Sequence, residues 1–580
     1  MTSVVTTGDT AEMTLSKSGD NKKINYTRLI FKGARAAETD GSDAWGGRSV
    51  IGNTTTDNIV AVDSGTYTNV YGGWTSGAGS TADSSKQKNS TLNKVTVSGT
   101  ASVTGTVYGG FTDVAGGKAT GNEVTIEKTI SGAVVGGSAT GEASNNMVAI
   151  HANTGAVTGG ISTGASASGN KVYLANVTVT SATGGDGAVT HNNEIHLNGN
   201  AHVTNALTGG TQANGTGNTL HVKGLNNTAG SIINVQKMTF DVTGAAQDST
   251  LLNVTGATQT YVNWASLTAT GMAAKPLTLL KNAHGINLDG YTGAVKSATT
   301  DTTETNVDVR KNSLGKITAI TYEGYQFAGV TTPVIDGGEA FGGISKAGNS
   351  THDNAITVNG DYTNVYGGHT SGAGTTRDDR DNSYSNSVTI TGGTIGNVYG
   401  GYTAAADGTT NNNTVTLAGG TVTGTVSGGN RTAQGNKLVV NANARVGRIE
   451  NFEKVAFKDA ASKLTLTGAG VKFDLASVNA GFDAAAQKQT LVESSNVLDL
   501  TGDTFRSDLS ADGMKETNIE ARDNKKKIVR YGYTLKNATT ATTVGSDTWG
   551  GRSAAGNTTT GNVLTFEHAQ KYAADAKTEN

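Results

Sequence analysis

An asparagine followed by apolar residues two and four positions later recurs along the whole chain. After Asn122, for example, these positions hold Val124 and Ile126, with Thr125 between them. Alternation with a period of two is typical of a strand with one buried face, so each occurrence predicts a short strand with its apolar side chains inward. The asparagines of this pattern are Asn58, Asn93, Asn122, Asn146, Asn170, Asn193, Asn218, Asn354, Asn386, Asn413, Asn436 and Asn562.

A second motif lies between these strands, an apolar segment that ends in two glycines. Examples are Val107-Tyr108-Gly109-Gly110 and, much later, Val398-Tyr399-Gly400-Gly401. Paired glycines fit a sharp corner, where φ can be positive and neighbouring segments can approach closely. The motif therefore predicts a corner that returns once in every repeat.

The spacing of the asparagines indicates the architecture. Asn122, Asn146 and Asn170 follow one another at intervals of 24 residues. A repeat of this length with two or three short strands predicts an all-β fold, a right-handed parallel β-solenoid (β-helix) with coils of about 24 residues. Equivalent residues then stack in ladders, and we expect the asparagine side chains to pass hydrogen bonds from coil to coil.

The sequence also contains a longer repeat, each copy of which spans several coils. The segment Asp43–Ser49, followed by Asn53, matches Asp547 to Ser553, followed by Asn557, and Glu339 to Gly343 begins a further copy. We therefore expect two super-repeats and the start of a third, cut from a longer product. The expected parts are a leading β segment (1–40), a first regular solenoid block (41–225), an irregular β connector (226–335), a second regular block (336–445), a second irregular connector (446–545) and the start of a third block (546–580).

Composition and charge narrow the function classes. The chain has 81 Gly, 2 Pro, no Cys and 6% aromatic residues, which suits short stacked coils better than large globular cores. The formal net charge of −3 gives no reason to expect nucleic acid as a partner. No run approaches the roughly 20 apolar residues of a membrane helix, so we expect no membrane span in this chain. The first 30 residues also lack the basic start and apolar core of a signal peptide.

Runs of this kind carry a family resemblance. Asn386-Ser387-Val388-Thr389-Ile390 with Gly396-Asn397-Val398-Tyr399-Gly400-Gly401, and the segment from Ile449 to Phe457, resemble the passenger repeats of bacterial autotransporter adhesins and related haemagglutinin-like proteins. The resemblance covers nearly the whole chain. It implies a secreted passenger domain at the bacterial cell surface, anchored in the outer membrane through a part not present here.

From this resemblance we expect a structural and adhesive surface stalk that mediates cell adhesion through an unidentified glycan or protein ligand on a host cell or other surface. Two alternatives stay open. One is a β-helical enzyme acting on polysaccharide, or a phage tail spike, and the other is a self-associating extracellular fibre. Nucleophile motifs, phosphate-binding loops and Cys-His metal spacings are absent from the sequence, so we expect no enzyme and no catalytic, cofactor or metal site.

Two groups of residues are candidates for facing a ligand. Trp74, Phe111, His369 and Tyr402 occupy one repeat position after the paired glycines, where they could stack on sugars or form a half-buried ladder. Arg377, Asp378, Asp379 and Asp381 lie in a long stretch after Gly367-Gly368, which predicts a loop on one face of the solenoid. Carboxylates there could bind calcium, or they could pair with the neighbouring arginines in a solvated loop.

Two histidines share an outward position of consecutive coils. His196 and His221 are 25 residues apart, each between two apolar residues, so their imidazoles should lie one strand spacing from each other. Stacked imidazoles could hold a metal ion or respond to pH, or they could be plain surface positions. The sequence pattern offers no third ligand at a fixed spacing.

Overall fold

The computed structural model is a parallel β-solenoid of about 16 turns, with essentially no helix among the residues described. The structure describes residues 3–7, 10–17, 24–77, 87–246, 248–272, 276–372, 381–431, 433–479, 488–544 and 546–565. The chain divides into two compact units. The first comprises Met1–Ser297 and Thr305–Gly324, and the second comprises Ala298–Glu304 and Tyr325–Asn580. The fold class expected from the coil pattern is thereby confirmed.

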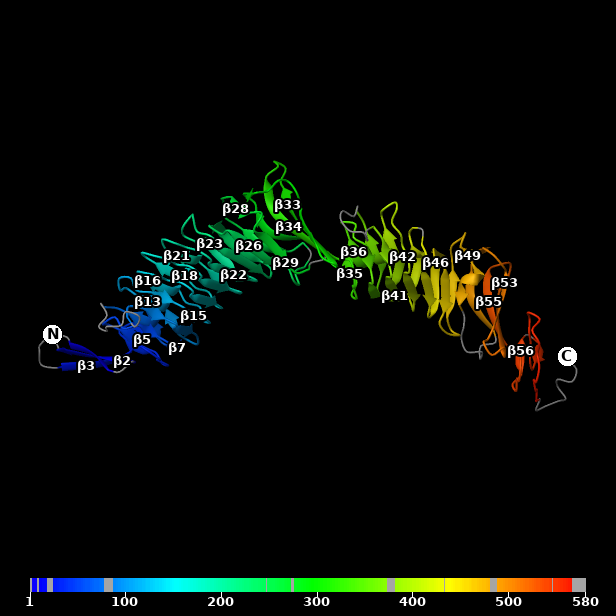
Figure 1. Ribbon diagram of the computed structural model, residues 1–580, viewed down its shortest axis with the longest axis horizontal. Coiled ribbons are helices and arrows are strands. Elements are labelled where there is room, and N and C mark those ends of the chain that lie inside the picture. Colours follow the sequence, from blue (N-terminus) through cyan, green and yellow to red (C-terminus); the bar gives the residue numbers. More distant parts are fainter. Residues whose placement is uncertain are drawn as a thin grey trace. The chain divides into compact units, whose positions relative to one another are not determined.

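In the first unit, the strands that follow the asparagines and the two strands after them form one parallel sheet, visible in Figure 1 as successive strands side by side. Its register pairs equivalent residues of neighbouring coils, such as Val124 with Val148 and Ile126 with Ile150. The strands are β7 (Ile59–Val62), β11 (Lys94–Val97), β15 (Glu123–Ile126), β17 (Met147–Ile150), β19 (Lys171–Leu174), β22 (Glu194–Asn198), β24 (Thr219–Lys223), β26 (Lys237–Asp241) and β29 (Leu267–Thr270).

The segments with paired glycines and the three strands that follow them in the stack form the second sheet of this unit. Its parallel strands are β5 (Asp43–Ser49), β9 (Val70–Thr75), β13 (Thr106–Thr112), β16 (Ala133–Ala139), β18 (Val157–Ser162), β21 (Ala182–Asp186), β23 (His202–Gly210), β25 (Asn227–Ile233), β27 (Thr250–Val254) and β30 (Leu277–Asn282). The apolar residues of both sheets fill one continuous core between them.

The second unit repeats this plan with its own apolar core. The strands after the asparagines are β38 (Ala355–Asn359), β41 (Ser387–Gly392), β43 (Thr414–Leu417), β45 (Lys437–Val440), β47 (Lys454–Phe457) and β50 (Val478–Asn479). The opposite sheet contains β36 (Glu339–Ser345), β39 (Tyr362–Thr370), β42 (Thr394–Thr403), β44 (Thr421–Gly429), β46 (Asn443–Glu450), β48 (Lys463–Leu466) and β51 (Lys488–Ser494).

The asparagines form a buried ladder in each unit. The backbone N–H and the side-chain Nδ2 of Asn122 both donate to Oδ1 of Asn146 at 3.0 Å, and Asn146 donates in the same way to Asn170. The eleven pattern asparagines from Asn58 to Asn436 are 0–1% exposed. In the first unit the ladder ends where Gln236 Oε1 accepts the backbone N–H of Asn218 at 3.0 Å. Each amide thereby satisfies polar groups that water cannot reach.

The paired glycines make room for this ladder. A Cβ on Gly109 would lie 2.4 Å from the carbonyl oxygen of Gly136 in the next coil, and a Cβ on Gly110 would lie 2.4 Å from Nδ2 of Asn122. Neither glycine has a positive φ. Of the two reasons expected for these glycines, close approach is therefore the one that applies.

The parallel coils extend further than the expected block boundaries. Strands β25 to β30 continue both sheets through residues that were expected to be an irregular connector (226–335), and β46 to β51 do the same within 446–545. These coils lack the asparagine and the paired glycines but keep buried apolar residues such as Leu251 and Leu252. Burial of apolar side chains alone is enough to continue the stack.

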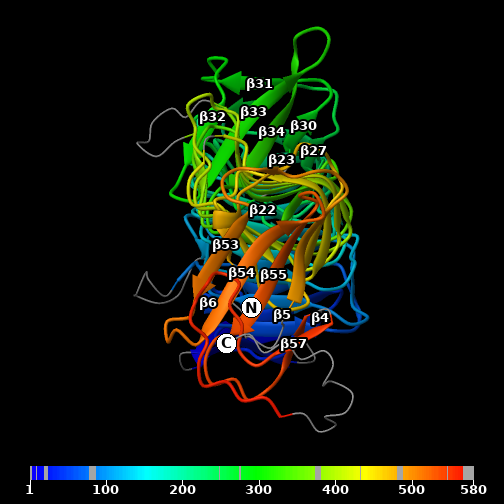
Figure 2. The ribbon, with the colours of Figure 1, turned by 90° about the vertical axis from the view of Figure 1, so that its right-hand side faces the viewer.

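Antiparallel strands end each stack. In the first unit β34 (Ile317–Gln326) pairs with the last parallel strand, β30, and continues into β33 (Thr303–Lys311) and β32 (Lys296–Thr299). In the second unit β55 (Lys527–Thr534) pairs with β51, followed by β54 (Lys515–Arg522) and β53 (Phe505–Leu509), which lie side by side in Figure 2. The chain begins with a similar set, β1 (Ser3–Thr7), β2 (Ala11–Lys17) and β3 (Ile24–Ile30).

A buried glutamate beside each set of antiparallel strands accepts hydrogen bonds from a coil later in the sequence; Glu304 and its partners all belong to the second unit. Glu304 accepts hydrogen bonds from Ser345 Oγ (2.7 Å), from the backbone N–H groups of Lys346 (2.6 Å) and Ala347 (3.1 Å), and from Asn349 Nδ2 (2.6 Å). Glu12 makes the equivalent contacts with Ser49, Val50 and Asn53, and Glu516 with Ser553, Ala554 and Asn557. We call this arrangement the glutamate clasp. It marks the start of every super-repeat.

Candidate functional site

A cluster of two histidines and one glutamate lies on the outer face of the first unit. Strand β22 carries Glu194 and His196, and β24 carries His221, which is the register partner of His196. The residues that alternate with them are apolar and 0–1% exposed, such as Ile195 and Leu220. Because successive side chains of a strand point to opposite faces, burial of these apolar residues directs Glu194, His196 and His221 outward.

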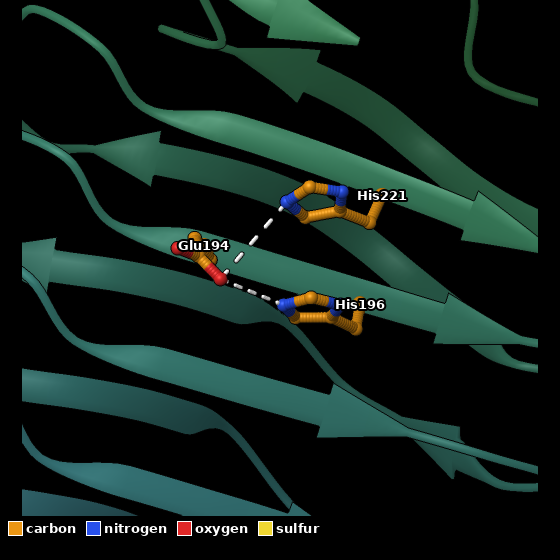
Figure 3. Close-up of side chains that lie close together, drawn as sticks. All are labelled: Glu194, His196 and His221. Atoms are coloured by element: carbon orange, nitrogen blue, oxygen red, sulfur yellow. Dashed lines mark hydrogen bonds and ion pairs between the residues drawn. The ribbon is translucent and has the colours of Figure 1, made fainter. Parts of the chain in front are cut away.

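The three side chains converge on one point, as Figure 3 shows. His196 Nε2 lies 3.0 Å from Glu194 Oε2, and His221 Nε2 lies 4.0 Å from the same oxygen. The two imidazoles are stacked, with ring centroids 4.3 Å apart and planes inclined by 12°. One ligand atom from each residue lies within 4.8 Å of the other two. Two imidazoles and a carboxylate at this separation form a donor set that a transition metal can use.

Neighbouring coils hold the cluster in place. Tyr173 of β19 stacks on the free face of His196 at 4.3 Å, and the hydroxyl of Thr239 on β26 lies 2.6 Å from His221 Nδ1. With Nδ1 in contact with that hydroxyl, Nε2 of His221 is the nitrogen directed toward Glu194. Lys171 also approaches the carboxylate, with Nζ 3.2 Å from Glu194 Oε2. Its side chain is 45% exposed, so this ion pair is weak.

Burial sets the protonation of the cluster. It lowers the pKa of both His196 and His221 below the ordinary histidine value, so both rings are neutral near pH 7. Burial opposes ionisation of Glu194, but hydrogen bonds from His196 and Lys171 outweigh it and hold the pKa of that carboxyl below its usual range. The site thus offers two neutral imidazoles and one carboxylate, and His196 Nε2 becomes a metal ligand when its proton moves to Nδ1.

The aromatic candidates form half-buried ladders. Trp74 lies at the outward register position of β9 next to Phe111 on β13, and His369 and Tyr402 are register partners in the second unit. Phe111 meets Tyr71 and Tyr108 edge-on, with centroids 5.7 and 5.2 Å apart. His369 and Tyr402 stack face to face at 4.8 Å. His369 and Tyr402 thus cover one face of each other, whereas Phe111 makes edge contacts.

Three of the charged candidates, Arg377, Asp378 and Asp379, lie outside the described residues. Asp381 is described and half-buried at the end of that stretch. Its backbone N–H donates to the carbonyl of Gly348 at 2.9 Å, and its carbonyl accepts from Thr403 Oγ1 at 2.5 Å. These backbone contacts attach Asp381 to the neighbouring coils.

Sequence reasoning missed Glu194 as the third member of the histidine cluster. It lies two residues before His196 and so shares its outward face, a signal that period-two alternation could have supplied. It also missed the glutamate clasp. In each unit it missed a lysine or arginine side chain that donates hydrogen bonds to backbone carbonyls. Lys296 Nζ contacts the carbonyls of Trp264, Ala265 and Leu267, and Arg506 contacts those of Leu475, Ala476 and Val478.

Comparison with protein-family models, with curated proteins and with solved structures finds no match for this chain. No helix among the residues described in the structure has the length and apolar character needed to cross a membrane.

Proposed function

We propose that this chain is the stalk of an exported bacterial surface protein, which extends from the cell surface and takes part in attachment. The observation that carries the proposal is the repetition of one complete building plan. A glutamate clasp, a buried asparagine ladder and a lysine or arginine side chain held by backbone carbonyls follow in the same order in both units. Repetition of a closed module adds length at about 4.8 Å per coil.

The hairpins support such an array. The carbonyls of Phe31, Phe327 and Leu535 accept from the first asparagine of their ladders, which makes these three residues equivalent. Ile24 and Tyr26 precede Phe31 by the same numbers of residues as Ile320 and Tyr322 precede Phe327, so the two pairs correspond. The latter pair belongs to β34, which pairs with β30 in the same sheet, and is 0% and 1% exposed, whereas Ile24 and Tyr26 are 73% and 59% exposed. By this equivalence, the edge of β3 is where the last strand of another block would pair.

The family resemblance supports the rest of the proposal, namely export, a cell-surface location and adhesion to a glycan or protein ligand. The aromatic ladders are the surface that such a ligand would meet. Trp74, Phe111 and Tyr402 are half-buried in these ladders, and their exposed parts are what such a ligand would contact.

Beads coated with the purified chain test the proposal on epithelial cell monolayers and on glycan arrays. We expect saturable binding that is reduced at least severalfold by the double substitution Trp74→Ala and Phe111→Ala. Thr96→Ala and Thr125→Ala change outward residues of the opposite sheet and serve as controls. Absence of binding to cells and glycans, together with cleavage of a polysaccharide, would overturn the stalk proposal in favour of a β-helical enzyme.

A further inference from the structure

The cluster of Glu194, His196 and His221 has a role that the stalk does not require. We propose that these three residues bind a zinc ion, which links two consecutive coils of the first unit. The donors come from two adjacent strands, since β22 supplies the carboxylate and one imidazole and β24 supplies the second imidazole. Zinc commonly takes three protein ligands of this kind and leaves a fourth position to water.

The geometry is close to what zinc requires. Bonds of about 2.0–2.1 Å in a tetrahedral site place ligand atoms about 3.3 Å apart. Here the carboxylate oxygen lies 3.0 Å from one Nε2 and 4.0 Å from the other, and all three atoms fall within 4.8 Å. Small rotations of the histidine side chains close the difference. The backbone does not need to move, because the register of β22 and β24 already brings the ligands together.

The residues around the ligands favour metal binding at this face. The contact between Thr239 Oγ1 and His221 Nδ1 holds the ring with Nε2 toward the site, as hydroxyl or carbonyl partners do for metal-bound histidines. Tyr173 fixes the plane of His196 by stacking. The ammonium group of Lys171 is the competitor, because it occupies the same carboxylate oxygen that the metal would use. Its side chain is 45% exposed and can turn away into solvent.

Titration of the full chain with zinc chloride, followed by calorimetry in metal-free buffer, tests the proposal. We expect one zinc ion per chain and at least a tenfold loss of affinity in each of Glu194→Gln, His196→Gln and His221→Gln. The matched control is His202→Gln, a half-buried outward histidine of β23 whose Nδ1 contacts Thr228, and it should bind zinc like the unaltered chain.

Two further variants act on the site without removing a ligand. Thr239→Val should weaken zinc binding, because it removes the partner of His221 Nδ1. Lys171→Met should strengthen binding severalfold, because it removes the competing cation. Circular dichroism and thermal midpoints without zinc check that each variant is folded. No binding by the unaltered chain, full affinity in any of the three ligand variants, or unchanged affinity in Lys171→Met would each overturn the proposal.

Discussion

At the scale of the residue, the buried asparagines satisfy the polar groups that lie between the regular coils. Asn146 uses every hydrogen-bonding group of its side chain. Its Oδ1 accepts from the backbone N–H and Nδ2 of Asn122, and its Nδ2 donates to Asn170 Oδ1 and to the carbonyl of Ala119. An aliphatic side chain in its place would leave several buried polar groups without partners. Such groups are costly because water cannot reach them.

The substitution Asn146→Ala should therefore lower the free energy of unfolding of the first unit by about 2–5 kcal/mol. Thr125→Ala, on the outward face of the neighbouring strand β15, should change it by less than about 0.5 kcal/mol. Urea unfolding followed by circular dichroism measures both. Equal effects of the two substitutions would show that the ladder contributes no more than an ordinary surface residue.

At the scale of the element, the hairpin and its glutamate clasp start each block, and the clasp makes stability depend on pH. Burial opposes ionisation of Glu516, but hydrogen bonds from Ser553, Asn557 and Asn518 outweigh it and lower the pKa of Glu516. A carboxyl whose pKa is lower in the folded state stabilises the fold above the ordinary glutamate pKa. That contribution is lost as the pH falls through the folded-state pKa.

We therefore expect Glu516→Gln to lower the thermal midpoint of the second unit at pH 7, by an amount that shrinks as the pH falls toward 3. Glu12 provides the contrast. Burial outweighs the hydrogen bonds at Glu12 and raises the pKa of its carboxyl. The protonated form is therefore favoured in the folded state, and ionisation of Glu12 lowers stability as the pH rises. Calorimetry of Glu516→Gln and Glu12→Gln across this pH range measures both. A parallel pH dependence of the two variants would contradict the assignment.

A second feature at this scale is the lysine or arginine side chain that donates hydrogen bonds to backbone carbonyls. Arg506 Nη1 donates to the carbonyl of Val478 at 2.9 Å and of Ala476 at 3.1 Å, and Lys296 occupies the equivalent place in the first unit. Arg506→Met should lower the free energy of unfolding of the second unit by about 1–3 kcal/mol, because the carbonyls lose a charged donor. Arg506→Lys should lose much less, because Lys296 serves the same carbonyls in the other unit. Urea unfolding compares the two variants, and equal losses would contradict this account.

At the scale of the whole molecule, the two units carry separate apolar cores. The core of the first unit runs from Ala44 to Tyr322, and that of the second from Val330 to Ile528. Each core is built from contacts between neighbouring coils, so the coils of one unit stabilise one another. Neither core contains a residue of the other among the residues described.

Calorimetry of the full chain should therefore show two unfolding transitions. Trp45, Trp74 and Trp264 lie in the first unit and Trp549 in the second, so tryptophan fluorescence should report mainly the first unit. Asn146→Ala should shift the transition that fluorescence follows and leave the other in place. A single transition that moves as a whole would show that the units unfold together.

The sequence by itself determined the local architecture. Alternating apolar residues after each asparagine predicted the strands, and the 24-residue spacing predicted the coil and its ladder, because stacking repeats the same short-range pattern in every turn. The half-buried aromatic rows and the outward stack of His196 and His221 also follow from position in the coil. Whether the chain is secreted and adhesive stays a prediction, since it depends on a family resemblance and not on these patterns.

The tertiary structure decided what depends on partners far apart in sequence. Glu304 lies 41 residues from Ser345, and no periodicity links them. The coils beyond Gln236 continue without the asparagine motif, because buried leucines are enough to hold the stack once it has begun. Glu194 joins the two histidines only when the register of β22 and β24 and the side-chain rotamers are known. The sequence pattern places a side chain on a face, but packing in three dimensions determines which atom it meets.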